Sequence, residues 1–407
     1  MNINIAYAYA DTESEWNCSQ WRCKIPSDTI NQTENHRARL VQVTDMINYA
    51  HPVVQEFLAA FDIIVVQRNM FAEEIWRACD YWRALGKLVC ADLDDDYPRL
   101  TVQNPAHRFW NLDKKGMRDS IGHRPTAGLQ EGLKHCDLLL SPSRLILEDW
   151  KDIIPGHHTP NYAFGPWYAD IEQKELGEQI VIGWGGSVSH FDSWWFGGAL
   201  DAADILFERH DNVIFKICGH DWRLLEVLRE RWPADRWIHQ LGVPAEQWPK
   251  QVASFDVGLA PLCGPEAPQS HEYDKRRSWL KAVEYLMCGV PWVGSPGPVY
   301  ADLAGKGGVL AADYTGEAWA DAVSDMVDNI EERKATSKEM MTWARNNLTM
   351  QANVEEYVDD LTHLFAVKQG AKGPKLPDVI YISDIPDETP QQATEPLPVS
   401  EQVEVGA

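Results

Sequence analysis

The sequence contains no apolar run of the roughly 18 residues that a membrane-spanning helix needs. Its start, MNINIAYAYADTESE, has no basic segment ahead of the apolar residues, and Asp11 comes too early for a secretory signal peptide. Cationic side chains are also scarce, since 37 lysines and arginines stand against 61 acidic residues and leave a net charge of −24. These absences predict a soluble, cytoplasmic protein, and they disfavour broad binding to nucleic acid or anionic membranes.

The eight cysteines are scattered, with no CxxC pair and no His/Cys set at zinc spacing. Several stand in apolar stretches, as Cys90, Cys136 and Cys218 do, where a buried and reduced thiol is the usual state. The sequence therefore indicates no metal centre, and we expect none.

Strand-length apolar runs alternate with helix-length periodic segments along most of the chain. This alternation predicts an α/β protein with parallel sheets, and 407 residues exceed what one hydrophobic core usually supports. We expect a first domain over residues 1–165, a linker over 166–179, a second domain over 180–350, a helix over 351–370, and a disordered, acidic, proline-rich tail over 371–407.

Four cations crowd the start of the segment DKRRSWLKAVEYLMCGVP, residues 274–291. If the segment is one helix, Arg277, Lys281 and Glu284 fall at i, i+4 and i+7 and share a face. The segment follows a strand-like run ending in APL, and α/β sheets bind ligands at strand ends and helix N-termini. An anion-binding site and a solvated helix face with a Lys281–Glu284 surface pair are both open on the residues alone.

The stretch IVIGWGGSVSHFDSW, residues 180–194, places Gly185, Gly186 and Ser187 between a strand-like run and a helix. Glycines in such a turn let backbone N–H groups approach a phosphate closely. A tight connection without a ligand is the alternative, because Val188 stands where a GxGxxG fingerprint needs glycine and no GK[ST] follows.

A group of carboxylates follows the strand-like run KLVCADL, in the stretch ADLDDDYPRL. At the carboxyl end of a strand, Asp94 and Asp95 can bind Mg²⁺, orient sugar hydroxyls or cap the next segment. The following residues, 107–124, hold five lysines and arginines against two aspartates, with Phe109 and Trp110 among them. We expect this segment to be either a solvated loop or a lip that holds an anionic or aromatic acceptor.

In this order, the motifs resemble those of the GT-B glycosyltransferases, in particular the large retaining family that uses nucleotide-sugar donors (family 4-like, group 1). GSVSHFD is similar to the Gly-Ser-x-x-His-x-Asp loop that opens the donor domain in one branch of that family. The run from DVGLAPL to CGVPWVGS is similar to the family's donor motif. DIIVVQRN, GKLVCADLDDD and WRCKIP, which contains Arg22, are similar to that branch's acceptor-domain segments, and the match spans most of residues 15 to 300.

The resemblance implies two Rossmann-like domains facing across a cleft, with the C-terminal helix returning to the first domain. It implies that Arg277 and Lys281 neutralise the diphosphate of a sugar nucleotide and that Glu284 accepts the ribose hydroxyls. The remaining donor-binding candidates are Gly185, Gly186, Ser187, His190 and Ser278. We place Arg22 and Trp110 on the acceptor side, and we expect no cofactor besides the nucleotide diphosphate sugar as co-substrate.

Two positions depart from the family pattern. Many relatives carry two glutamates eight positions apart, and the first would fall at Arg276, so Asp274 or Glu272 is the candidate carboxylate for gripping the donor sugar. Many relatives also place a histidine after the third strand of the first domain, where this chain has Asp94 and Asp95. The expected catalytic set is therefore Asp94, Asp95 and Asp274.

The expected function is transfer of a sugar from a nucleotide diphosphate sugar, with retention and without a metal, to an acceptor that is a protein, glycan, lipid or modified nucleic acid. The basic segment motivates the nucleic-acid acceptor as a minority hypothesis. Two alternatives are a sugar-nucleotide epimerase of the same fold and a non-catalytic protein that binds sugar nucleotides.

Overall fold

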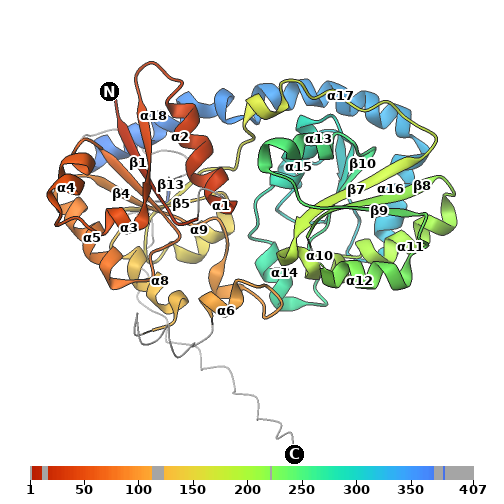
Figure 1. Cartoon of the computed structure of the whole chain (residues 1–407), viewed down its shortest axis with the longest axis horizontal. Coiled ribbons are helices and arrows are strands. Elements are labelled where there is room, and N and C mark those ends of the chain that lie inside the picture. The colour runs from red at the N-terminus through yellow and green to blue at the C-terminus, as the bar shows by residue number, and fades with distance from the viewer. Residues whose placement is uncertain (1, 12–16, 112–122, 221, 371–378, 381–407) are drawn as a thin grey trace, which may run out of the picture.

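The computed structural model forms two α/β bodies that lie side by side, each built on its own β-sheet (Figure 1). The structure describes residues 2–11, 17–111, 123–220, 222–370 and 379–380. Residues 112–122 of the basic segment, and the predicted tail apart from 379–380, lie outside the described residues. The two sheets confirm the predicted α/β class with two Rossmann-like domains.

The first sheet has the strand order β13-β6-β5-β4-β3-β1-β2. Its parallel strands are β1 (Asn4–Tyr9), β2 (Arg37–Gln42), β3 (Ile63–Gln67), β4 (Leu88–Asp92), β5 (Leu138–Ser141) and β6 (Gly156–His158). The short β13 (Val379–Ile380) pairs with β6 in the antiparallel sense. Every residue of β3, β4 and β5 is buried, which explains why these central strands are continuous apolar runs in the sequence.

Helices cover both faces of the first sheet. They are α1 (Asn17–Ser19), the π-helical turn η1 (Gln20–Lys24), α2 (Ile25–Ile30), α3 (Val43–Met46), α4 (Pro52–Ala59), α5 (Glu73–Ala84), α6 (His107–Trp110), α8 (Pro125–Leu133) and α9 (Arg144–Trp150). The C-terminal α18 (Met350–Lys368) packs Val358, Leu361 and Phe365 into the core beneath β1, β3 and β5. The predicted return of the C-terminal helix to the first domain is confirmed (Figure 1).

The second sheet has six parallel strands in the order β12-β11-β10-β7-β8-β9. They are β7 (Ile180–Ser187), β8 (Val213–His220), β9 (Trp237–Gln240), β10 (Val257–Ala260), β11 (Trp292–Gly294) and β12 (Gly308–Leu310). The helices are α10 (Phe191–Phe196), α11 (Ala199–Arg209), α12 (Trp222–Arg231), α13 (Trp248–Val252), α14 (Pro268–Asp274), α15 (Leu280–Met287), α16 (Gly316–Asp328) and α17 (Ile330–Asn347). Large indole rings fill the core, among them Trp184, Trp194, Trp292 and Trp319.

Two local predictions need correction. The glycines expected in a turn belong to a strand, because β7 continues to Ser187 and pairs with β8 along its whole length. The segment expected as one helix from residue 274 is two helices, because α14 ends at Asp274 and α15 begins at Leu280. Arg277 therefore lies in the connection between the helices, where its Nε donates to Asp274 Oδ1 at 2.8 Å and ties the turn to the end of α14.

The chain crosses between the two bodies twice, and the crossings are hydrogen-bonded to each other. Ala163 N donates to Leu348 O at 2.9 Å, and Met350 N donates to Ala163 O at 2.8 Å. The first crossing is also anchored to the second body, because Lys174 Nζ lies 2.5 Å from the fully buried Asp256. These bonds fix where the two sheets face each other.

Candidate functional site

A cavity of about 1130 Å³ lies between the two bodies and is lined by residues of both. Its walls come from the loops at the carboxyl ends of β1, β4 and β7 and from the first turns of α15. Parallel strands end at one edge of a sheet, and open α/β sheets bind ligands at that edge. The cavity brings together predicted residues of both domains: Arg22, Asp94, Asp95, Ser187, His190, Arg277, Ser278, Lys281 and Glu284.

The cations Arg277 and Lys281 lie at the amino end of α15, where the helix dipole adds partial positive charge. The Arg277 guanidinium lies over the ring of Tyr273 at 4.8 Å, and its Nη2 donates to Ser189 O at 3.3 Å. Lys281 Nζ donates to the carbonyl of Gly185, and burial lowers the pKa of Lys281 to about 8. Two enclosed cations beside a helix N-terminus favour an anionic ligand.

Glu284 lies one turn further along α15 and also faces the cavity. Burial raises the pKa of Glu284 to about 7, against a hydrogen bond from the Trp248 indole and the charge of Lys281. Glu284 is only 8% exposed, and Trp248 lines the same cavity. Such a group suits hydroxyl donors on a bound ligand.

His190 enters the cavity from the loop after β7 and lies against Arg277. Arg277 Nη1 is 3.3 Å from His190 Nε2, and a guanidinium can only donate, so Nε2 accepts and the proton sits on Nδ1. Burial, together with the charges of Arg277 and Lys281, lowers the pKa of His190 well below its ordinary value. The imidazole is therefore neutral and adds no cation to the site.

Asp274 does not line the cavity but lies buried behind Arg277. Its carboxylate accepts from Ser193 Oγ at 3.0 Å, Cys263 N at 2.8 Å and Arg277 Nε at 2.8 Å. The geometry makes Asp274 a support for the Arg277 side chain and gives its predicted catalytic role no direct contact with the cavity.

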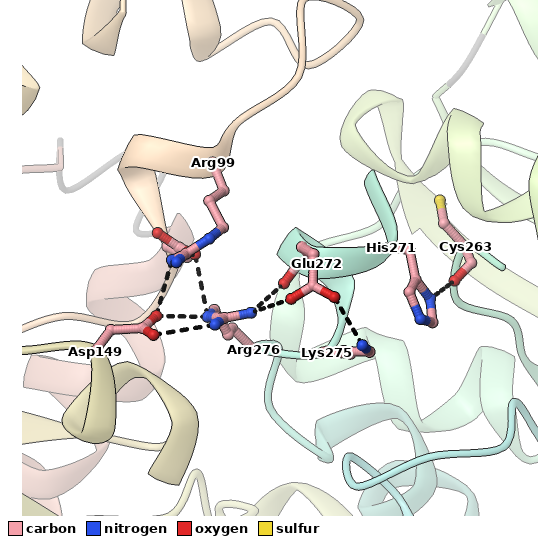
Figure 2. A network of polar contacts seen from close by, with 8 residues as sticks. Arg99, Asp149, Cys263, His271, Glu272, Lys275 and Arg276 are labelled. Carbon is pink, nitrogen blue, oxygen red and sulfur yellow. Dashed lines mark hydrogen bonds and ion pairs between the residues drawn. The ribbon is translucent and has the colours of Figure 1, made fainter. Parts of the chain in front are cut away.

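Arg276 turns away from the cavity and joins the two bodies through an ion network (Figure 2). Its Nε and Nη2 lie 2.5 and 3.0 Å from the carboxylate of Asp149 in α9, and its Nη1 lies 3.0 Å from Glu272. Arg99 of the first body also donates to Asp149, at 2.8 Å. Hydrogen bonds from Lys275 and Arg276 lower the pKa of Glu272 to about 2, so this carboxylate is engaged in the network and does not line the cavity.

Gly185 and Gly186 make room for tryptophan rings. A Cβ at Gly185 would lie 2.0 Å from the Trp248 ring, and one at Gly186 would lie 2.4 Å from the Trp184 ring. Both glycines are paired with β8, and neither lines the cavity. Ser187, the last residue of β7, is exposed and does line the cavity. Of this motif, Ser187 lies at the cavity, whereas the two glycines are residues of the sheet.

Asp94 and Asp95 form the first-domain wall together with Cys18, which the sequence analysis did not single out. Asp94 Oδ1 accepts from Tyr97 O–H at 2.7 Å, and burial raises the pKa of Asp95 to about 6 against the charge of Arg277. Among the described residues, these three side chains are the group with metal-ligating atoms within 4.8 Å of one another. They offer three ligand atoms, fewer than the four of a structural zinc site and as many as the three protein ligands of a catalytic one.

Arg22 lines the cavity, but its guanidinium is fully engaged by protein acceptors. It contacts Asp92, Thr159 and Asn161, and its side chain is 5% exposed. Trp110 lies in the core of the first body, 4% exposed and stacked on Tyr97 at 4.1 Å between ring centroids. Neither position supports the direct acceptor contact that we expected of these residues.

Asn161 and Trp248 are cavity residues that the sequence analysis missed. Asn161 lies in the stretch HHTPNYAF, where prolines and scarce apolar residues indicate a connection and carry no sign of a site. Trp248 reaches Glu284 from α13, and no local pattern links residues so far apart in the sequence.

Among the described residues, no helix is both long enough and apolar enough to cross a membrane.

No protein-family model matches the chain, and no curated protein matches it in sequence. Solved structures do resemble it. A glycosyltransferase from Rickettsia africae matches 91% of this chain and 100% of its own, with a TM-score of 0.59 and 11% identity. Sucrose-phosphate synthase from Thermosynechococcus elongatus matches 90% and 100%, with a TM-score of 0.58 and 10% identity.

HepE from Anabaena, in a complex with UDP-glucose, matches 89% of this chain and 100% of its own, with a TM-score of 0.57 and 11% identity. At such identities the likeness concerns the fold. The chain has a GT-B glycosyltransferase-like fold.

Proposed function

We propose that the protein is a glycosyltransferase that takes a sugar from a nucleotide diphosphate sugar, with retention and without a metal. The observation that carries this proposal is the pair Arg277 and Lys281, enclosed at the amino end of α15 in a cavity between two Rossmann-like sheets. In this proposal Glu284, one turn further along α15, accepts the hydroxyls of the ribose that follows the diphosphate.

The chemistry of the leaving group supports these assignments. When the sugar departs, negative charge develops on the nucleoside diphosphate, and fixed cations stabilise that charge without having to reorganise. Arg277 is held by Asp274 and by Ser189 O, and Lys281 by Gly185 O, so both cations are in place before the ligand arrives. In this proposal Ser187 and Ser278 donate further hydrogen bonds to the diphosphate.

Asp94 and Asp95 face the donor motif from the first domain, and we assign them to the acceptor hydroxyl or the transferring sugar. The pKa of Asp95, raised to about 6 by burial, keeps part of this carboxyl protonated near neutral pH. A group with a pKa near the working pH is suited to exchange a proton with a sugar hydroxyl.

The test is turnover of labelled donors. UDP-glucose is the first donor to try, because HepE was solved with that compound; GDP-, ADP- and CDP-sugars follow. We expect release of the nucleoside diphosphate, slow with water and faster with an acceptor drawn from proteins, glycans, lipids and nucleic acids. Lys281→Ala should abolish it, whereas the change Lys250→Ala at an exposed lysine of α13 should not. A wild-type protein that releases no nucleoside diphosphate from any donor would leave only the binding function.

The product separates the proposal from its nearest alternative. An epimerase yields a second sugar nucleotide or a free sugar without any acceptor, whereas a transferase forms a new glycosidic bond. Retention is read from the anomeric proton of the product by NMR, and an inverted product would refute that part of the proposal.

A further inference from the structure

A chain of hydrogen bonds, buried at Arg22 and partly buried at Ser278, runs from β4 of the first body to the donor motif of the second. Arg22 Nη1 lies 2.9 Å from Asn161 Oδ1, and Asn161 Nδ2 lies 3.0 Å from Ser278 Oγ. The backbone of Asn161 joins the same connection, since its carbonyl accepts from Trp279 Nε1 at 3.0 Å. One residue between the domains therefore contacts the two residues that immediately precede α15.

The direction of this chain is set by Arg22. A guanidinium has five N–H groups and no acceptor. The Nε and Nη2 atoms donate to Asp92, Nη2 also donates to Thr159 Oγ1, and Nη1 donates to Thr159 O and to Asn161. All five N–H groups are used, which explains why Arg22 lines the cavity without offering it a donor.

The orientation of the Asn161 amide follows. The amide atom facing Arg22 must be an acceptor, so it is Oδ1, and the NH₂ group faces Ser278. Ser278 Oγ consequently accepts a hydrogen bond, and its own O–H has no acceptor among the described residues. Ser278 lines the cavity beside Arg277 and Lys281. Its hydrogen is therefore free for an oxygen of a ligand held there.

We propose that Asn161 is a positioning residue that turns the Ser278 hydroxyl toward the diphosphate of the bound nucleotide. Arg22, held by Asp92, donates to Asn161, Asn161 donates to Ser278, and Ser278 donates to a phosphate oxygen. A residue of the first domain, Arg22, thereby decides that Ser278 of the second domain donates its hydrogen to the ligand. This inference rests on the proposed binding of a nucleoside diphosphate, and it adds a role for a residue between the domains.

The substitution Asn161→Asp tests the direction of the chain. An aspartate of the same shape still accepts from Arg22, but its second oxygen accepts from Ser278 and turns that hydroxyl away from the ligand. A hydrogen bond to a charged group contributes about 10- to 100-fold in affinity. We expect Ser278→Ala to weaken UDP binding by that factor in the wild-type background, and by less than about twofold when Asn161 is already aspartate.

Isothermal titration with UDP, then with GDP, ADP and CDP, measures the four proteins of this cycle. The added negative charge weakens binding in both serine backgrounds and cancels in the comparison. Asn212→Asp, at an exposed site of the second domain, controls for net charge. Thermal melting checks that each variant folds. If Asn161→Asp does not fold, Asn161→Ala replaces it, because alanine also frees the Ser278 hydroxyl from the Asn161 amide. In the Asn161→Ala background, the loss of affinity caused by Ser278→Ala should also be smaller than in wild type.

The outcomes separate the two proposals. A Ser278→Ala loss that depends on the residue at 161 supports the positioning role. A loss of equal size in both backgrounds overturns it and leaves the proposed function standing. No loss at all in a wild-type protein that binds UDP overturns it together with the assignment of Ser278 to the diphosphate, and leaves the proposed glycosyl transfer standing. A wild-type protein that binds none of the four nucleoside diphosphates overturns the proposed function, and this inference falls with it.

Discussion

The ion pair between Arg22 and Asp92 gives the sharpest prediction about stability. Their side chains are 5% and 2% exposed, and the nearest nitrogen and oxygen atoms are 2.6 Å apart. Asp92→Asn removes the charge that balances the Arg22 guanidinium and leaves a buried cation whose direct hydrogen-bond partners are all neutral. Removing one partner of a buried pair costs about 3–5 kcal/mol, because the remaining charge has lost its water and gained no other compensation.

Urea unfolding, followed by circular dichroism and fluorescence, measures this loss. Glu73→Gln is the matched control, since Glu73 and Arg77 form an i, i+4 pair on α5 whose side chains are 60% and 66% exposed. Such a surface pair contributes about 0.3–0.5 kcal/mol. If Asp92→Asn cost less than about 1 kcal/mol, the stabilisation that we assign to the buried pair would be refuted.

Three further predictions concern the ion network between the two bodies and the cavity. Asp149→Asn removes the charge that Arg276 and Arg99 share between the bodies and should lower the free energy of unfolding by about 1–2 kcal/mol. The control is Asp152→Asn at an exposed position, and a loss no larger than that of the control would contradict this prediction. The pKa of Glu284, raised to about 7, makes the folded chain bind more protons than the unfolded chain between pH 4.5 and 7, so this group lowers stability as the pH rises through that window. The free energy of unfolding of Glu284→Gln, taken relative to wild type, should therefore be roughly 1–3 kcal/mol higher at pH 8 than at pH 4.5. Urea unfolding measures it, and the same difference at both pH values would refute the burial argument. Nucleotide affinity should be unchanged by EDTA, because Arg277 and Lys281 supply the charge; a loss on chelation that added Mg²⁺ or Mn²⁺ restores would show that a metal takes part.

The central strands were predictable because burial on both faces makes each of them a continuous apolar run, as in β3 and β4. The edge strand β2 gives no such signal, since only two residues of RARLVQ are buried and two are arginines. The two helices of the donor motif were read as one, because periodicity locates a hydrophobic face but not the buried carboxylate of Asp274 that organises the turn between them.

The site also contains contacts that the local sequence predicts and contacts that it does not. The donor residues Arg277, Lys281 and Glu284 stand close together in the sequence, and a shared helix face or turn brings them to one cavity. The contacts of Asn161 with Ser278 and of Arg276 with Asp149 join positions more than a hundred residues apart. Such contacts depend on how the two sheets face each other, which no local pattern in a single sequence encodes.

The most direct test of the central claim is thermal and chemical stabilisation of the whole chain by UDP, GDP, ADP and CDP. A ligand at 100 times its Kd adds about 2.7 kcal/mol to the free energy of unfolding. We expect this stabilisation with at least one nucleoside diphosphate, its loss in Lys281→Ala and its persistence in Lys250→Ala. Stabilisation by none of them, or the same stabilisation in Lys281→Ala as in wild type, would contradict a diphosphate site at the amino end of α15.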